Sequence, residues 1–193
     1  MGNYRGVVQG SVQTGYFDQP AEGYPGQLAT ITDPNMIDGF IVNSAGVLTP
    51  GLGVIANANL SIASNDYGNI PSPYDVRLPT GGDTFAEFVG VAVRDSAMPN
   101  SDAGAPQWEG STMAPVLRQG RIYVTTNEAV TAGAAVRMYI TDTDAHGAPI
   151  GSFRTSAAST PADAIAITNA RFYRAAAAGL AIIEIISANP AVI

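Results

Sequence analysis

Residues 116–124 read VLRQGRIYV, with a short apolar run on either side of Gln119–Gly120. A glycine between two such runs is typical of a tight turn, so this stretch predicts a compact β-hairpin. On its C-terminal side, segments 129–136 and 138–140 continue the strand pattern, and on its N-terminal side FAEFVGVAV (85–93) is the clearest strand. The last apolar run, LAIIEII (180–186), predicts a strand buried on both faces.

The remaining segments also favour strands over helices. Residues 40–42 and 47–55 indicate a strand, a turn and a second strand, and 171–173 favours another strand. Residues 64–83 contain too many Pro, Gly and Asn residues for a central strand, which predicts a long surface excursion. The expected fold is mostly β: a jelly-roll-like β sandwich or barrel with long Pro/Gly-rich loops, forming a single domain over 28–193.

The N-terminal segment 1–27 shows neither a helical nor a strand period and predicts an extended arm. A solvated linker is usually poor in aromatic residues. This arm carries several of them, so we expect it to lie against another surface, either a partner or its own domain. The expected capsid or subunit contacts are Tyr4, Arg5, Tyr16, Phe17 and Tyr24.

Composition points to an assembly component. Charged residues make up 13% of the 193 residues, against roughly 25% in an average soluble domain, so we expect other chains to cover part of the surface. The net charge of −7 argues against nucleic acid as a partner. All nine basic residues are Arg, which suits either a protein interface or a GC-rich genome. The sequence has no apolar stretch long enough to suggest a membrane span. It also shows no basic leader followed by an apolar run, so secretion is not expected.

The sequence predicts no metal or cofactor site. The chain has no cysteine, and its one histidine, His146, lies in TDTDAHG (141–147). Alternating Asp residues followed by Gly resemble the start of a calcium loop, but Phe153 stands where such a loop needs its Glu. Residues 141–147 are therefore interpreted as a polar hairpin loop.

Catalytic residues are not predicted either. No Gly-x-Ser-x-Gly motif accompanies His146, which argues against a serine hydrolase. Glu87 and Glu184 interrupt apolar strands, and each is interpreted as an outward-facing residue or as the partner of an arginine such as Arg121 or Arg137. The expectation is a protein without enzymatic activity.

The order of segments over about residues 20–186 resembles the structural cement proteins of tailed bacteriophage capsids. The segments that carry the resemblance are YPGQ (24–27), FIV (40–42), VLTPG (47–51), FVGVAVRD (88–95), VLRQGRIYV (116–124), AVTAGAAV (129–136), ARF (170–172) and GLAIIEI (179–185). Two stretches depart from the family pattern, the Pro-rich excursion at 64–82 and the loop at 97–110.

The resemblance implies a non-enzymatic protein on the outer surface of an icosahedral head, assembled in the host cytoplasm, that ties major capsid subunits together. The implied partners are the major capsid protein and further copies of the chain, as a homodimer or homotrimer, with no nucleic acid, membrane or cofactor. Two other classes stay open. A carbohydrate-binding β module would use Trp108, Tyr67 and Tyr74 as exposed aromatic residues, and a β-fold hydrolase would depend on His146.

Overall fold

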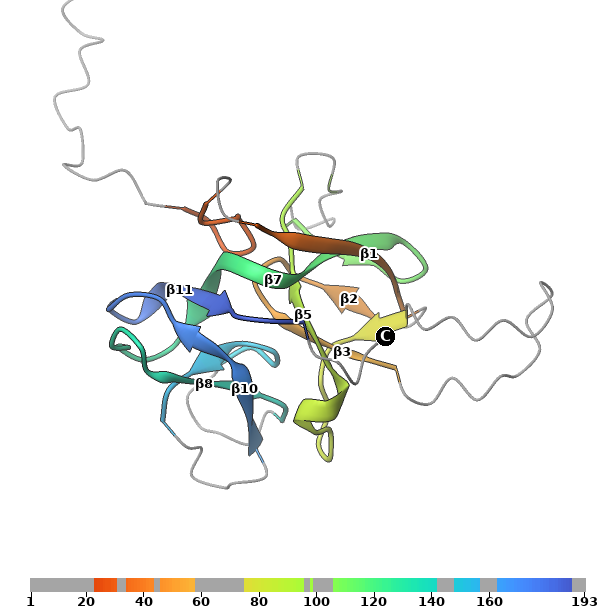
Figure 1. Ribbon diagram of the computed structural model, residues 1–193. Coiled ribbons are helices and arrows are strands. Elements are labelled where there is room, and N and C mark those ends of the chain that lie inside the picture. The colour runs from red at the N-terminus through yellow and green to blue at the C-terminus, as the bar shows by residue number, and fades with distance from the viewer. Residues whose placement is uncertain are drawn as a thin grey trace, which may run out of the picture.

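The computed structural model describes residues 23–30, 34–43, 46–57, 75–95, 98, 106–141, 148–156 and 163–188, and strands dominate this part of the chain (Figure 1). A short 3-10 turn, η1 (Phe85–Glu87), precedes β5. The mostly β sandwich or barrel class predicted from the sequence is confirmed. The strands are β1 (Met36–Val42), β2 (Val47–Leu48), β3 (Gly53–Ala56), β4 (Asp75–Arg77), β5 (Phe88–Ala92), β6 (Trp108–Glu109), β7 (Met113–Thr126), β8 (Ala135–Tyr139), β9 (Phe153–Arg154), β10 (Ala164–Phe172) and β11 (Gly179–Ile185).

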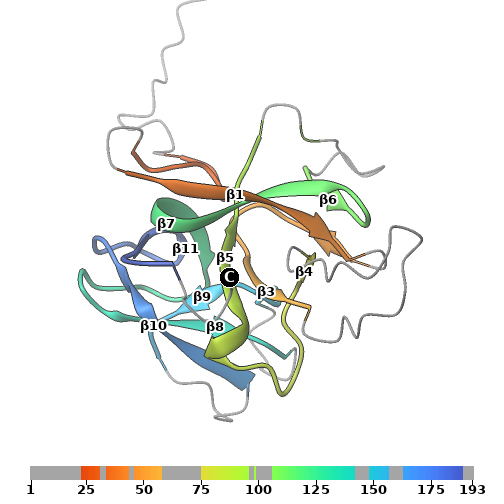
Figure 2. The ribbon, with the colours of Figure 1, turned by 45° about the vertical axis from the view of Figure 1, so that its right-hand side comes forward.

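Strand β7 runs through the middle of the molecule and belongs to two closed rings of strands (Figures 1 and 2). Its first half, residues 113–119, pairs with β1 and β5, and the first ring runs β7, β1, β4, β3, β5. Its second half, residues 120–126, pairs with β11 and at its end with β9, so the second ring runs β7, β11, β10, β8, β9. Closing a sheet on itself removes exposed strand edges.

The predicted hairpin at Gln119–Gly120 is wrong. The chain continues through Gly120 as one strand, and the glycine, with a φ of 124°, marks the change from the first ring to the second. Each half of β7 pairs with strands from distant parts of the chain, so the two halves do not pair with each other. A glycine in a strand interior often marks such a bend.

Two hydrophobic cores fill the rings, and β7 contributes to both. Successive side chains of a strand point to opposite faces. Val116 therefore enters the core of the first ring, while its neighbour Leu117 enters the core of the second. The first core also contains Phe40, Val42, Val54, Val76 and Ala114, and the second also contains Val124, Met138, Phe153, Ile167, Phe172 and Ile183. The second core packs in part against the outer face of the first ring.

Several predicted strands have different bounds in the structure. The segment 85–93 begins as the turn η1, and its strand covers only Phe88–Ala92. The segment 47–55 divides into β2 and β3, because β2 pairs with β6 in a separate two-stranded sheet. The apolar run near the C-terminus is confirmed as a strand, β11, in which Ala181, Ile182 and Ile183 are all buried.

The interpretation of 64–83 as a surface excursion without a central strand is wrong for residues 75–77. Residues 75–77 form β4, which lies between β1 and β3 in the first ring. Val76 is fully buried in the first core, and the burial of this side chain explains why β4 pairs with β1 and β3. Among the described residues, no helix is long and apolar enough to cross a membrane.

Candidate interaction surface

The outer face of β1 and the start of β7 presents apolar side chains to solvent. Phe40 is buried in the first core, so its neighbours Gly39 and Ile41 face outward. Ile41 lies directly opposite Met113 in the β1–β7 pair. The exposed fraction is 39% for Ile41 and Ile37 and 68% for Met113. We call Ile37, Gly39, Ile41 and Met113 the β1 strip; β1 lies on the side of the molecule away from β8 and β10 (Figures 1 and 2).

Met113 lies over the bare backbone of Gly39. A Cβ added to Gly39 would be 2.9 Å from the Met113 Sδ atom, so a larger residue would displace the methionine. An unbranched thioether side chain adapts to an irregular partner surface. The β1 strip therefore has the chemistry of a protein contact, apolar and adjustable, without a polar group for catalysis.

The end of the predicted arm lies along the second half of β7. The Gly26 N–H donates a hydrogen bond to the Tyr123 carbonyl at 2.8 Å, and the Tyr123 N–H donates to the Gln27 carbonyl at 2.9 Å. Tyr24 is 58% exposed, with the Arg94 guanidinium 5.2 Å from its ring centroid. Of the predicted contact residues, Tyr24 alone lies in the described part.

The other predicted contact residues, Tyr4, Arg5, Tyr16 and Phe17, lie outside the described residues, so their role stays a prediction. The same holds for His146 and the rest of 142–147, and for Tyr67 and Tyr74. Trp108 is buried, with 8% of its surface exposed, and its Nε1–H donates to the Val93 carbonyl at 3.3 Å. Its expected role as an exposed sugar-binding residue is wrong, because its ring fills the first core.

The two glutamates of the apolar strands have structural partners. Glu87 accepts a hydrogen bond from the Thr84 N–H at 2.8 Å and so caps η1. Glu184 forms ion pairs with Arg121 at 2.8 Å and with Arg171 at 2.6 Å, which confirms the interpretation of Glu184 as the partner of an arginine. Burial raises the pKa of Glu184, but the hydrogen bonds from Arg171 and Arg121 outweigh burial and hold this pKa below its ordinary value.

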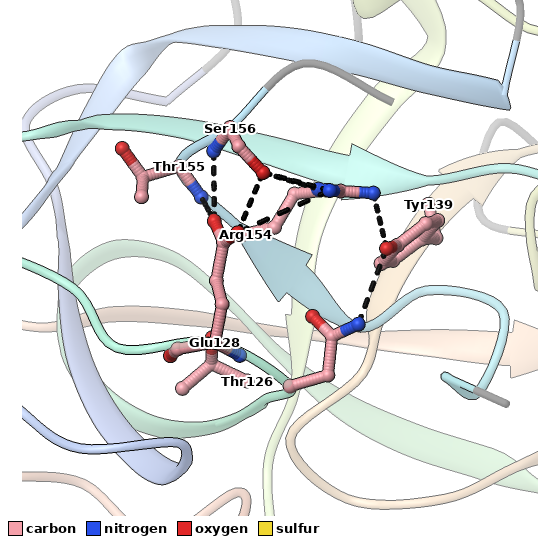
Figure 3. A network of polar contacts seen from close by, with 7 residues as sticks. Thr126, Glu128, Tyr139, Arg154, Thr155 and Ser156 are labelled. Carbon is pink, nitrogen blue, oxygen red and sulfur yellow. Dashed lines mark hydrogen bonds and ion pairs between the residues drawn. The ribbon is translucent and has the colours of Figure 1, made fainter. Parts of the chain in front are cut away.

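A polar network links strand ends of the second ring (Figure 3). This network was not predicted from the sequence. Arg154 is 6% exposed and donates to the hydroxyl of Tyr139 on β8. Glu128, just after β7, accepts hydrogen bonds from the Thr155 N–H at 2.5 Å and the Ser156 N–H at 2.7 Å. The network thus ties the ends of β7, β8 and β9 together.

The Glu128 carboxylate is poorly suited to act as a base. Burial raises its pKa, but hydrogen bonds from Ser156 and Thr155 and the charge of Arg154 outweigh burial, so the pKa lies below its ordinary value. A carboxylate that already accepts several hydrogen bonds has little tendency to take a proton at neutral pH. Within the described ranges, no group of three or more His, Asp or Glu residues is placed to hold a metal ion.

Comparison with known proteins identifies the family. A family model described as "Structural cement protein (E217 gp24/Pam3 gp6)" matches residues 12–186, most of the chain. The chain belongs to the structural cement protein family. The predicted resemblance is thereby confirmed, and the chain is a structural protein of a bacteriophage.

A solved structure shares the fold of this cement protein. A chain from "The capsid of Myoviridae Phage XM1" superposes with a TM-score of 0.61 at 17% sequence identity, over 88% of this chain and 93% of that chain. No curated protein matches the cement protein. The overall fold described above therefore also occurs in the chain from that capsid.

Proposed function

We propose that this cement protein binds the outer surface of a tailed-phage icosahedral head and stabilises contacts between major capsid subunits, without enzymatic activity. The observation that carries the proposal is the β1 strip, an exposed apolar face on a member of a structural cement family. Burial of a large apolar side chain contributes about 1.5 to 3 kcal/mol, so the strip is a source of binding free energy.

The strip alone is smaller than a stable interface. A specific protein interface buries roughly 800 Å² on each partner, more than a few side chains supply. We therefore propose that the arm, with Tyr4, Arg5, Tyr16, Phe17 and Tyr24, supplies further contacts with the capsid. Several contacts on one head act together, because the first contact raises the effective concentration of the next.

The low content of charged residues supports self-association as a homodimer or homotrimer on the head. A net charge of −7 disfavours nucleic acid as a partner. The proposed location is the outer surface of the virion, after assembly in the host cytoplasm. The alternative of a carbohydrate-binding module loses support from the burial of Trp108.

The test measures binding of purified chain to heads that lack it, by cosedimentation at increasing chain concentration. Wild type is expected to saturate at a fixed number of copies per head and to raise the temperature at which the heads rupture. Met113→Asp should weaken binding tenfold or more, because burying an unpaired carboxylate against an apolar partner is unfavourable.

Ala132→Asp is the matched control, since Ala132 lies on an exposed turn before β8 and receives the same charge. It should bind as wild type does. Absence of saturable binding by wild type would overturn the proposed function. Equal binding by wild type and Met113→Asp would instead show that the β1 strip is not part of the contact with the head.

A further inference from the structure

A tight turn at residues 24–27 presents an exposed tyrosine where the N-terminal arm joins the body of the protein. The Gln27 N–H donates to the Tyr24 carbonyl at 2.9 Å, and Gly26 has a φ of 80°. Proline at the second position and a glycine with positive φ at the third are typical of a type II turn. Tyr24 is 58% exposed, whereas Gly26 is buried. The turn therefore holds the Tyr24 ring in solvent on a backbone that packs against the body.

The backbone of this turn is fixed from two sides. The Gly26 carbonyl accepts a hydrogen bond from the Arg94 N–H at 2.7 Å, in addition to the bond from the Gly26 N–H to β7. A Cβ added to Gly26 would be 2.4 Å from the Pro50 Cβ atom, so the turn packs closely on the segment around Pro50. A partner that binds Tyr24 therefore does not have to order the backbone beneath it, which lowers the entropic cost of binding.

Arg94 lies beside Tyr24 and is exposed as well. Its guanidinium carbon is 5.2 Å from the centroid of the Tyr24 ring, within the range of a cation–π contact. Among the described residues, no carboxylate forms an ion pair with Arg94. A guanidinium group has five N–H donors and no acceptor. Its N–H groups are therefore open to an oxygen acceptor on a partner.

The two side chains form a ready-made contact pair. Tyr and Arg are enriched among the few residues that carry most of the free energy of protein interfaces. Arg94 covers part of the Tyr24 ring and leaves the rest of the ring exposed, so a partner meets an aromatic surface beside a bank of hydrogen-bond donors. This pairing suits a protein surface that offers an apolar side chain next to an oxygen acceptor.

The position of the pair along the chain indicates which partner reaches it. The arm, residues 1–22, ends two residues before Tyr24. Under the proposed function the arm lies on the capsid, so the capsid subunit that holds the end of the arm lies beside Tyr24. The occupant of the pair is then the same subunit that binds the arm.

The pair is also close to the β1 strip. The Val93 N–H donates to the Pro115 carbonyl at 2.9 Å, and Pro115 pairs with Gly39 of the strip. Neighbouring strands lie about 4.8 Å apart, so the backbones of Val93 and Gly39 are about 10 Å apart across β7. A standard interface of roughly 800 Å² on each partner is wider than this separation. One capsid subunit is therefore large enough to contact both the strip and the pair.

We propose that Tyr24 and Arg94 act together as an anchor on a major capsid subunit: an oxygen acceptor of the subunit binds the Arg94 guanidinium, and an apolar side chain of the subunit packs on the Tyr24 ring. This inference rests on the proposed function, because it takes the partner of the arm to be the capsid. The capsid is favoured over a second copy because the arm and the β1 strip, the two proposed capsid contacts, lie on either side of the pair.

The first test measures head binding by variants of each anchor residue, by cosedimentation. Arg94→Ala and Tyr24→Ala should each bind heads at least tenfold more weakly than wild type. Tyr24→Phe keeps the ring and should bind nearly as wild type does, and Arg94→Lys should recover part of the loss because it keeps the charge without the planar group. The control is Arg137→Ala, because Arg137 on β8 also forms no ion pair with a described residue, and its variant should bind as wild type does.

The double variant tests whether the two residues act as a unit. Tyr24→Ala combined with Arg94→Ala should bind no more than about threefold more weakly than the weaker single variant, because each single change already disrupts the shared contact. A double loss equal to the product of the two single losses would show two independent contacts and would overturn the paired anchor.

Melting temperatures separate binding from folding. Both side chains are exposed, so the single variants should melt within a few degrees of wild type. If Tyr24→Ala unfolds, Arg94→Ala and Arg94→Lys still decide the question. Wild-type binding that Arg94→Ala matches would overturn the anchor alone, whereas absence of saturable wild-type binding would overturn the proposed function and the anchor together.

The second test identifies the occupant. Benzoylphenylalanine at position 24 keeps an aromatic ring there and is activated by light on decorated heads, and the crosslinked peptides are sequenced by mass spectrometry. The expected product joins position 24 to a peptide of the major capsid protein. A crosslink to a second copy of the cement protein, or to residues 1–22 of the arm, would overturn the proposal.

Discussion

Gly120 of β7 lies directly against Asn35, and a Cβ added to the glycine would be 2.1 Å from the Asn35 Oδ1 atom. Asn35 is itself held by a hydrogen bond from its Nδ2 atom to the Thr30 carbonyl at 2.9 Å. The bend that joins the two rings therefore depends on a residue without a side chain. This contact connects the segment before β1 to the change of ring within β7.

Gly120→Ala should lower the free energy of unfolding by about 2 to 4 kcal/mol, because the added methyl group displaces Asn35 and the backbone at φ 124° is unfavourable for alanine. The control is Gly179→Ala, at φ 123° with no atom within 4 Å of the added Cβ. It should lower stability by about 1 kcal/mol, from backbone strain alone. Chemical denaturation measures both, and equal losses would show that the Asn35 contact contributes nothing.

Tyr139→Phe should lower the free energy of unfolding by about 1 to 3 kcal/mol, because Arg154 and Asn127 both donate to the hydroxyl that is lost. Tyr173→Phe is the control, since Tyr173 is 43% exposed and its ring stays in place under Arg121. Thermal unfolding should leave this control at the wild-type value. A Tyr139→Phe protein as stable as wild type would contradict a stabilising role for the network.

Acid should destabilise the protein through Asp83, Glu128 and Glu184. Burial raises the pKa of each, but hydrogen bonds to arginine, hydroxyl or backbone donors outweigh burial, so the folded pKa lies below the ordinary value of 3.8 for Asp83 and 4.5 for the glutamates. Their contribution is complete above these values and is lost as the pH falls through the lower folded pKa values. Denaturation between pH 7 and pH 2.5 measures the loss.

Glu128→Gln provides an internal control for the acid effect. The variant should be less stable than wild type near pH 7, where only wild type has the carboxylate that the Thr155 and Ser156 N–H groups and Arg154 stabilise. The difference should shrink toward acid pH, because a protonated glutamate is neutral like glutamine. If the difference in stability between the two proteins stayed constant with pH, Glu128 would stabilise the fold through its shape and not through its charge.

Removal of residues 1–22 should leave the fold nearly intact and weaken attachment to the head. The remaining segment keeps the hydrogen bonds of Gly26 and Gln27 with β7. Each aromatic residue buried against a partner contributes about 1.5 to 3 kcal/mol before the segment's ordering entropy is subtracted, so head binding should fall at least tenfold. A melting temperature many degrees lower, with head occupancy unchanged, would show instead that the arm folds on its own domain.

Local features of the sequence predicted much of the fold. Apolar runs predicted β11, the last two residues of β10 (171–172) and the strand part of 85–93, because side-chain periodicity depends on neighbouring residues alone. An ion pair for Glu184 was also predictable, because a carboxylate within an apolar strand needs a compensating charge. The low charge content indicated contacts with other chains, and the order of segments identified the cement protein family.

The pairing of strands was decided by the tertiary structure. Gly120 suits a hairpin turn and a bend equally well, and the outcome depended on whether the halves of β7 paired with each other or with β1 and β11. Arg121 and Glu184 are 63 residues apart, and Asp38 and Arg118 are 80 apart. Contacts over such separations depend on how the whole chain folds, a property that no local pattern contains. The network around Arg154 forms because β7, β8 and β9 meet in the second ring, a pairing that their separate local sequences do not contain.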